Sequence, residues 1–149
     1  MGRTAKVTAI AFAVFVFLGI SILLARALVG PGNERSEVLE LLHAEARGDS
    51  DAVLARLAPC RAEPACVTVV RERAPKLRRP GKVLILQYEP SVQVALTRQQ
   101  GTARVAWRTD ADPDPVVQCV KVVREGPLTG GHAELVAISG PLPGTASCP

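Results

Sequence analysis

The chain has 149 residues, of which 48% are hydrophobic, and 18 basic against 14 acidic side chains give it a formal charge of +4. Arg3, Lys6 and Arg26 flank one apolar run, so 15 basic and 14 acidic side chains remain in residues 27–149. That near balance lacks the attraction that drives binding to phosphate backbones, and it excludes nucleic acid as the expected partner. The 123 residues after Arg26 are enough for one hydrophobic core and exclude a second globular domain.

The apolar run from Val7 to Ala25 contains nineteen consecutive uncharged residues. A helix of that length spans roughly 28 Å, close to the thickness of the hydrocarbon core of a bilayer. We therefore predict a cytoplasmic N-terminus at residues 1–6 and a transmembrane helix, or uncleaved signal anchor, at residues 7–28. The alternative is a secretory signal cleaved after Ala27, because Ala25-Arg26-Ala27 fits a small-x-small site.

Residues 29–33 are predicted to be a linker, because Gly30-Pro31-Gly32 does not favour a continuing helix. An amphipathic helix follows, capped at its start by Asn33 or Ser36 and ended by Gly48. Its apolar stripe consists of Val38, Leu41, Leu42 and Ala46.

Asp49 supplies a new N-cap, which predicts a short second helix that ends at Pro59. Together the two helices form a hairpin with a tight connection. Residues 64–74 combine a proline suited to a first helical turn with several strand-forming residues, and we predict a short helix there.

The four cysteines all follow the apolar run: Cys60, Cys66, Cys119 and Cys148. An even number favours two disulfides, and of the three possible pairings proximity along the chain favours Cys60 with Cys66, which leaves Cys119 with Cys148. Free or reactive thiols and a metal site are the alternatives. Closely spaced Cys-x-x-Cys or His pairs, which zinc sites use, do not occur in the sequence. Disulfides place the soluble part in an oxidising space outside the cytoplasm.

After Gly81 the apolar residues alternate or form short blocks, which predicts strands at Val83–Tyr88, Val92–Leu96, Ala103–Trp107, Val116–Val123 and Ala133–Ile138. The segments between them are rich in turn-forming residues: 89–91, 99–101, 110–115 and 126–131. Short successive connections indicate an antiparallel meander.

One predicted strand shows which side of the sheet is dry. Ala103, Val105 and Trp107 share one face, whereas Arg104 and Arg108 share the other. We therefore expect the helices to cover the first face and solvent to reach the second.

This order of helices followed by a meander resembles the NTF2-like (cystatin-like alpha plus beta cone) superfamily. Ala46-Arg47-Gly48-Asp49 looks like the helix end and restart common in that superfamily. The segment from Cys60 to Cys66 resembles a disulfide loop of membrane-anchored extracytoplasmic members from high-GC bacteria. The resemblance covers residues 34–140, leaving 141–149 as a Pro-rich tail. It implies an α+β fold in which a transmembrane helix precedes a helical hairpin packed on a curved antiparallel meander sheet.

The superfamily contains small-molecule enzymes that use the interior of the cone, as well as non-catalytic membrane scaffolds. The resemblance makes Tyr88 and Trp107 possible cavity residues, with Glu89, His132 and Glu134 beside them on strands. None of these residues matches a catalytic motif, so we assign no catalytic residue and no cofactor.

Two charged segments are further candidates. Asp110, Asp112 and Asp114 alternate like the start of a calcium loop, but Pro115 and Lys121 occupy the positions of its turn glycine and ligating glutamate, so we predict an acidic hairpin tip and no metal site. Six basic residues crowd one stretch: Arg71, Arg73, Lys76, Arg78, Arg79 and Lys82. Such a cluster suits an anionic membrane surface, an anionic wall polymer or an acidic envelope protein, and its alternative is a solvated linker.

From these features we predict a single-pass cell-membrane protein with its C-terminal domain outside the cytoplasm. Its expected role is a binding or assembly module, not an enzyme. The alternative is a small-molecule enzyme or carrier that uses the cavity of the cone. A secreted form after signal cleavage is the alternative location.

Overall fold

The computed structural model describes residues 2–91, 98–125 and 132–148, and the chain divides into two compact units, Met1–Gly32 and Asn33–Pro149. The first unit belongs to helix α1 (Arg3–Arg47), whose segment Lys6–Ala25 is long and apolar enough to cross a membrane. No residue of that segment is buried by the protein. Of the described residues, the large apolar side chains that are exposed all belong to this segment except Val69 and Leu86.

The helix end predicted at residues 29–33 is wrong, because α1 is helical without interruption from Arg3 to Arg47. A proline inside a helix costs one hydrogen bond and a steric clash, and the long helix-forming sequences on both sides of Pro31 outweigh that cost. The boundary between the two units still lies in this segment, between Gly32 and Asn33.

The end of α1 agrees with the sequence prediction. Gly48 adopts a φ of +69°, the left-handed conformation that ends many helices. Asp49 then caps α2 (Ser50–Arg56), its carboxylate accepting a hydrogen bond of 2.9 Å from the Ala52 N–H. The predicted helix near residues 64–74 is confirmed as α4 (Pro64–Arg73), which continues into a 3₁₀ turn, η1 (Ala74–Leu77).

A further short helix was not expected from the sequence. Pro59 does not simply end the second helix, because it lies in the first turn of α3 (Ala58–Arg61). Proline fits that position, since its missing N–H is one that a first turn leaves without a partner in any case.

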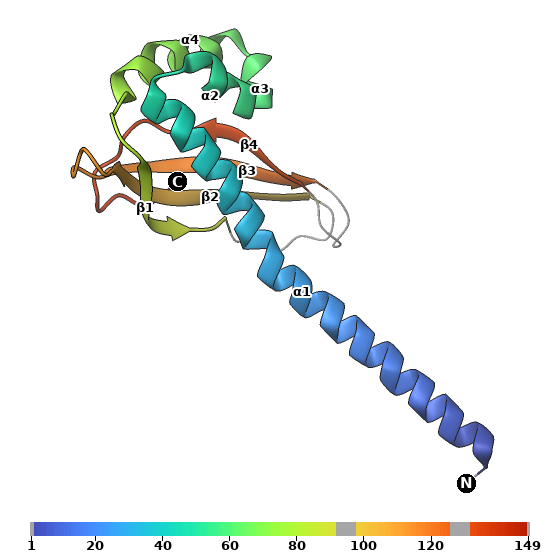
Figure 1. Cartoon of the computed structure of the whole chain (residues 1–149). Helices are drawn as coiled ribbons and strands as arrows, with labels where there is room; N and C mark the ends of the chain where they lie inside the picture. The colour runs from blue at the N-terminus through green and yellow to red at the C-terminus, as the bar shows by residue number, and fades with distance from the viewer. Residues whose placement is uncertain (1, 92–97, 126–131, 149) are drawn as a thin grey trace. The chain divides into compact units, whose positions relative to one another are not determined.

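The described strands form one four-stranded antiparallel sheet in the order β1-β2-β3-β4, which is the meander predicted from the sequence. The second unit is therefore α+β. They are β1 (Val83–Glu89), β2 (Arg98–Thr109), β3 (Val116–Glu125) and β4 (His132–Ile138). Helices α2, α3 and α4 lie on the same side of the sheet as the end of α1 (Figure 1). The strand predicted at residues 92–96 and the turn predicted at 126–131 lie outside the described residues.

The turn predicted at residues 99–101 is wrong, because β2 runs through it and pairs with β3 from Arg98 to Trp107. Gly101 serves a different purpose there. A Cβ atom at Gly101 would lie 2.6 Å from the Cβ of Ser91, so only glycine lets Ser91 lie against the strand.

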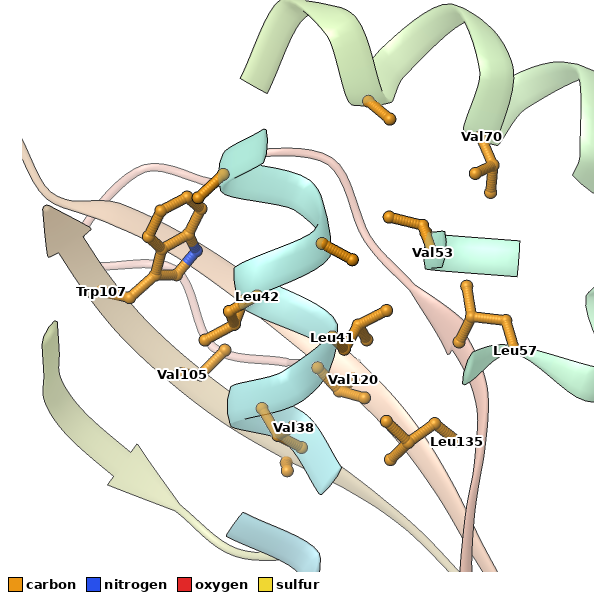
Figure 2. Close-up of a cluster of buried hydrophobic side chains, with 14 of the residues drawn as sticks. Val38, Leu41, Leu42, Val53, Leu57, Val70, Val105, Trp107, Val120 and Leu135 are labelled. Atoms are coloured by element: carbon orange, nitrogen blue, oxygen red, sulfur yellow. The ribbon is translucent and has the colours of Figure 1, made fainter. Parts of the chain in front are cut away.

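The core lies between α1 and the inner face of the sheet (Figure 2). Leu42 points toward Val105 and Trp107 of β2, whereas Leu41 points toward Val53 and Leu57 of the following helices. The predicted dry face is confirmed, since the side chains of Ala103, Val105 and Trp107 are completely buried. Apart from Trp107, the labelled residues of this core are aliphatic.

The opposite face of the sheet is drier than expected, because the C-terminal tail lies across it. Leu142 forms a β-bridge with Val117, and Arg104 donates hydrogen bonds to the carbonyl oxygens of Gly144 (2.6 Å) and Ala146 (3.0 Å). Arg104 was predicted to face solvent. Instead its guanidinium holds down the tail, and Val117 beneath is 5% exposed.

Two cysteine pairs lie at disulfide distance, Cys60–Cys66 and Cys119–Cys148, with Cα–Cα distances of 5.4 and 5.7 Å. This is the pairing that the sequence favours. The first bridge closes the loop between α3 and α4, and the second fastens the tail to the middle of β3.

We expect the double variant Cys119→Ser/Cys148→Ser to lose roughly 3 to 4 kcal/mol of unfolding free energy, because opening a loop of this length restores chain entropy to the unfolded state. Urea unfolding can be followed by the fluorescence of Trp107, the only tryptophan of the chain. Wild-type protein without reductant is the reference. An unchanged unfolding midpoint would show that the hydrogen bonds of Arg104 hold the tail without the bridge.

Candidate functional site

A buried carboxylate holds the start of the second unit together. The Glu34 side chain is completely buried, and it accepts hydrogen bonds from the Tyr88 hydroxyl (2.5 Å), the Ser91 N–H (3.0 Å) and the Ser91 hydroxyl (2.8 Å). The Arg124 guanidinium from the far end of β3 pairs with the same carboxylate. We call Glu34, Tyr88, Ser91 and Arg124 the Glu34 cluster.

The Glu34 cluster satisfies its carboxylate so fully that its role is structural. One cation and three hydrogen-bond donors compensate the charge, which is the arrangement that a buried carboxylate needs. Burial, together with the negative charge of Glu34 nearby, raises the pKa of Tyr88 far above its ordinary value. Tyr88 therefore stays a neutral donor and is unsuited to act as a base.

A second buried carboxylate lies near the other end of the helix. Glu45 is 2% exposed, and its Oε2 atom has no hydrogen-bond partner. Burial raises the pKa of Glu45 to about 7, and hydrogen bonding to Gln118 and the positive charge of Arg73 offset only part of that effect. Near neutral pH this carboxyl is thus divided between its charged and neutral forms.

Gln118 links Glu45 to the rest of the core. Its Oε1 atom accepts a hydrogen bond of 2.7 Å from the Trp107 indole, and its Nε2 atom donates one of 3.1 Å to the Ser139 carbonyl. The side chains of Gln118 and Trp107 are completely buried. The position of Trp107 in the core is therefore fixed by a hydrogen bond as well as by packing.

Tyr88 and Trp107 do not line a common cavity. Trp107 is packed in the core beside Leu42 (Figure 2). The Tyr88 hydroxyl donates its hydrogen bond to Glu34 instead. Aliphatic side chains fill the space between α1 and the sheet. The candidates Glu89, His132 and Glu134 are exposed at the ends of strands β1 and β4.

An open groove of about 520 Å³ lies along β4. Its lining comes from three elements: Glu37 of α1, Ala55 and Arg56 of α2, and His132, Ala133, Glu134 and Leu135 of β4. Ala133 and Leu135 lie opposite Arg124 and Val122 of β3, two residues of the inner face of the sheet. The groove thus lies beside the edge strand, on the side where the helices cover the sheet. We call it the β4 groove.

The charges around the β4 groove are predominantly negative. Arg56 contacts both Glu37 (3.2 Å) and Glu40 (3.4 Å), so this one cation is shared between two carboxylates. Glu134 of β4 lies opposite Val123, so its side chain points to the other face of the sheet, away from Ala133 and Leu135. Two carboxylates and one guanidinium leave one negative charge beside the groove.

The predicted basic cluster is partly used inside the fold. Arg79 pairs with Asp112 (2.8 Å) and donates to the Asp114 carbonyl (2.8 Å), while Arg73 donates to the Ile138 carbonyl (3.2 Å). Arg71 lies 4.0 Å from Asp51. The side chains of Lys76, Arg78 and Lys82 are exposed, and they are what remains of the cluster as a surface for anions.

The acidic hairpin tip has a structural function. Asp110 accepts a hydrogen bond of 2.7 Å from the Lys82 N–H, and Asp112 pairs with Arg79. Across the described ranges of the chain, no group of three or more His, Cys, Asp or Glu side chains is placed to hold a metal ion. The sequence analysis treated the aspartates and the basic cluster as separate candidates. In the structure Asp110 and Asp112 bind residues of that cluster.

Sequence reasoning identified neither Glu34 nor Glu45 as a buried carboxylate. The signal was present in the spacing, because residues 34, 38, 41 and 45 follow one another at intervals of four, three and four. Alternating intervals of three and four residues are typical of the buried face of a helix. A glutamate on such a face is expected to be either paired or neutral.

Comparison with protein-family models, with curated proteins and with solved structures returned no match.

We expect Glu34→Ala to lower the unfolding free energy by about 3 to 5 kcal/mol, because it leaves the Arg124 charge and the Ser91 donors without their buried acceptor. Glu34→Gln retains the size of the side chain but removes the charge, and its loss should be smaller. Glu37→Gln, one turn away and exposed, is the matched control and should change stability by less than about 1 kcal/mol. Equal effects of the Glu34 and Glu37 variants on urea unfolding would contradict the structural role.

The Glu45 carboxyl makes stability depend on pH. Its pKa is about 7 in the folded protein and 4.5 in the unfolded reference, so the folded state binds the extra proton between these values and stability falls as pH rises from about 4.5 to 7. Glu45→Gln should remove this loss, so its advantage over wild type grows from near zero at pH 4.5 to about 3 kcal/mol at pH 8.

The measurement is urea unfolding at a series of pH values, and the difference between variant and wild type cancels the other titrating groups. Glu40→Gln, on an exposed face of the same helix, is the control and should follow wild type at every pH. Parallel curves for wild type and Glu45→Gln would contradict the assignment.

Proposed function

We propose that the chain is a membrane-anchored extracytoplasmic binding or assembly module whose second unit has the NTF2-like fold. The observation that carries the proposal is the filled interior of this unit. Val38, Leu41 and Leu42 of α1 pack directly on Val105, Trp107 and Val120 of the sheet, a space that an enzyme of this superfamily would keep open. An open hollow, the β4 groove, lies instead at the sheet edge.

The NTF2-like assignment is supported by the order of the elements. Helices come first along the chain, and a four-stranded antiparallel meander follows and packs one face against them. This arrangement is common to the superfamily, and it differs from the alternation of strands and helices in parallel α/β folds.

Anchoring and location are supported by two independent features. The segment Lys6–Ala25 is apolar enough to span a bilayer, and a signal sequence would share that property. Two cysteine pairs at disulfide distance suit an oxidising space outside the cytoplasm. Since positive charges near the two ends of the segment are balanced, the disulfides carry the orientation, with the N-terminus in the cytoplasm.

The anchor is tested by the mass of the mature chain and by whether the chain is recovered in the membrane fraction or the soluble fraction of the cell. We expect the full-length chain in alkali-washed membranes, and proteolysis of its second unit when protease is added outside intact cells. Ala27→Leu blocks the small residue that a signal peptidase requires, so variant and wild type should have the same mass and the same fraction. Recovery of a soluble wild-type chain that starts at Leu28, with a larger Ala27→Leu product, would overturn the anchor.

A further inference from the structure

We infer that the proton on Glu45 controls whether the segment between β4 and the C-terminal tail stays docked on β3. We call this segment, residues 139–142, the tail turn. The tail turn is docked while the Glu45 carboxyl is neutral, and it opens more readily once that proton is lost. This conformational change goes beyond the proposed function. The inference draws on a buried carboxyl that lacks a partner, the two donors beside it, and the carbonyls that those donors hold.

The Glu45 carboxyl is enclosed at the end of α1. Its side chain is buried, and its Oε2 atom has no hydrogen-bond partner. A carboxyl in such a place is tolerated in its neutral form, whereas its charged form requires a cation or further donors. Loss of the proton therefore makes Glu45 compete for the donors around it.

Two side chains act on the Glu45 carboxyl, and both also hold the end of β4. Gln118 of β3 hydrogen-bonds to it, and the Gln118 Nε2 atom donates a bond of 3.1 Å to the Ser139 carbonyl. Arg73 of α4 places a positive charge near it, and the Arg73 guanidinium donates a bond of 3.2 Å to the Ile138 carbonyl. Two consecutive carbonyls thus share their donors with Glu45.

The other charged groups of the described residues are engaged elsewhere or exposed. On the inner face of the sheet, Arg124 and Tyr88 belong to the Glu34 cluster, about three helical turns away. His43 lies on the opposite side of α1, and Arg79 directs its guanidinium to the acidic hairpin tip. The remaining ionisable side chains near the end of α1 are exposed: Arg47, Asp49, Arg71, Glu72, Lys76 and Arg78.

The tail turn continues the pairing with β3 beyond the end of β4. The Ser139 N–H donates to the Cys119 carbonyl and the Leu142 N–H donates to the Val117 carbonyl, both at 2.8 Å. A Cβ atom at position 140 would lie 3.5 Å from the Arg73 Cζ atom, so the guanidinium lies against this turn. The disulfide to β3 holds the far end of the tail, and the tail turn can therefore open as a loop with both of its ends attached.

Loss of the proton changes which acceptor suits Arg73 best. A hydrogen bond to a carboxylate is roughly twice as strong as one to a neutral carbonyl, so a charged Glu45 draws Arg73 away from Ile138. Burial raises the pKa of Glu45 to about 7, against 4.5 for a carboxyl exposed to water. The docked state therefore binds the extra proton between these values, and opening becomes easier as the pH rises from about 4.5 to 7.

The test is hydrogen exchange of the full chain, with both disulfides intact, in nanodiscs of phosphatidylcholine. Protection of the Ser139 and Leu142 amides is measured from about pH 5 to about pH 8 and corrected for the pH dependence of intrinsic exchange. We expect protection to fall at least about tenfold over this range, because opening releases the proton of Glu45. Amides in the middle of β2 and β3 should stay more protected at every pH, since the opening is local.

Matched variants identify the groups responsible. Glu45→Gln cannot ionise and should keep the protection of the tail turn constant within about twofold, whereas Glu40→Gln, exposed on α1, should follow wild type. Arg73→Met removes the positive charge that lowers the pKa of Glu45, so the fall in protection should move to higher pH. Arg71→Met, exposed on the same helix, is its control and should leave the pH dependence unchanged.

Protection of the tail turn that does not depend on pH, or that falls equally in wild type and Glu45→Gln, would overturn the inference. Protection equal to that of the central strands at every pH would overturn it as well, because the tail turn would then exchange only through global unfolding. Glu45→Gln removes a charge and keeps the size of the side chain, so it keeps the test decisive even where Arg73→Met disturbs folding.

Discussion

The second unit depends on how one helical segment, residues 33–47 of α1, lies against the inner face of the sheet. Its sheet-facing stripe begins and ends with a carboxylate, because Glu34 and Glu45 are eleven positions apart, about three turns of helix. Aliphatic residues fill the stripe between them. With one tryptophan and one tyrosine in the whole chain, the domain has little aromatic surface to bury, and this helix supplies a large share of its core.

The two buried carboxylates, Glu34 and Glu45, differ in how many hydrogen-bond partners surround them. Arg124 and three hydrogen-bond donors surround the Glu34 carboxylate. Glu45 lacks such partners for Oε2, and burial shifts it toward the neutral form. The first therefore fixes the position of the helix on the sheet through directional bonds, whereas the second makes the fit of the helix depend on proton concentration.

Elements with strong local signals were predictable from the sequence. The turn of Gly48 and Asp49 and the alternation in β2 depend on neighbouring residues, and the structure agrees with both. Apart from the pairing of the cysteines, long-range side-chain contacts were not predictable. The sequence marked Gly101 as a turn residue, because nothing local reveals that Ser91 lies against it, and Arg79 and Asp112 are 33 positions apart. The β4 groove combines three separate elements, so no single stretch of sequence encodes it.

The two covalent bridges divide the domain into a cross-linked part and a part held only by contact. Neither loop, residues 60–66 nor residues 119–148, includes α1. Tension applied at Asn33 along the helix axis would therefore shear the Glu34 cluster and the aliphatic stripe without loading a sulfur–sulfur bond. Under such a force the helix–sheet contact resists through packing, hydrogen bonds and the Glu34–Arg124 ion pair alone. The helix that leads from the apolar segment into the domain is thus held without a covalent cross-link.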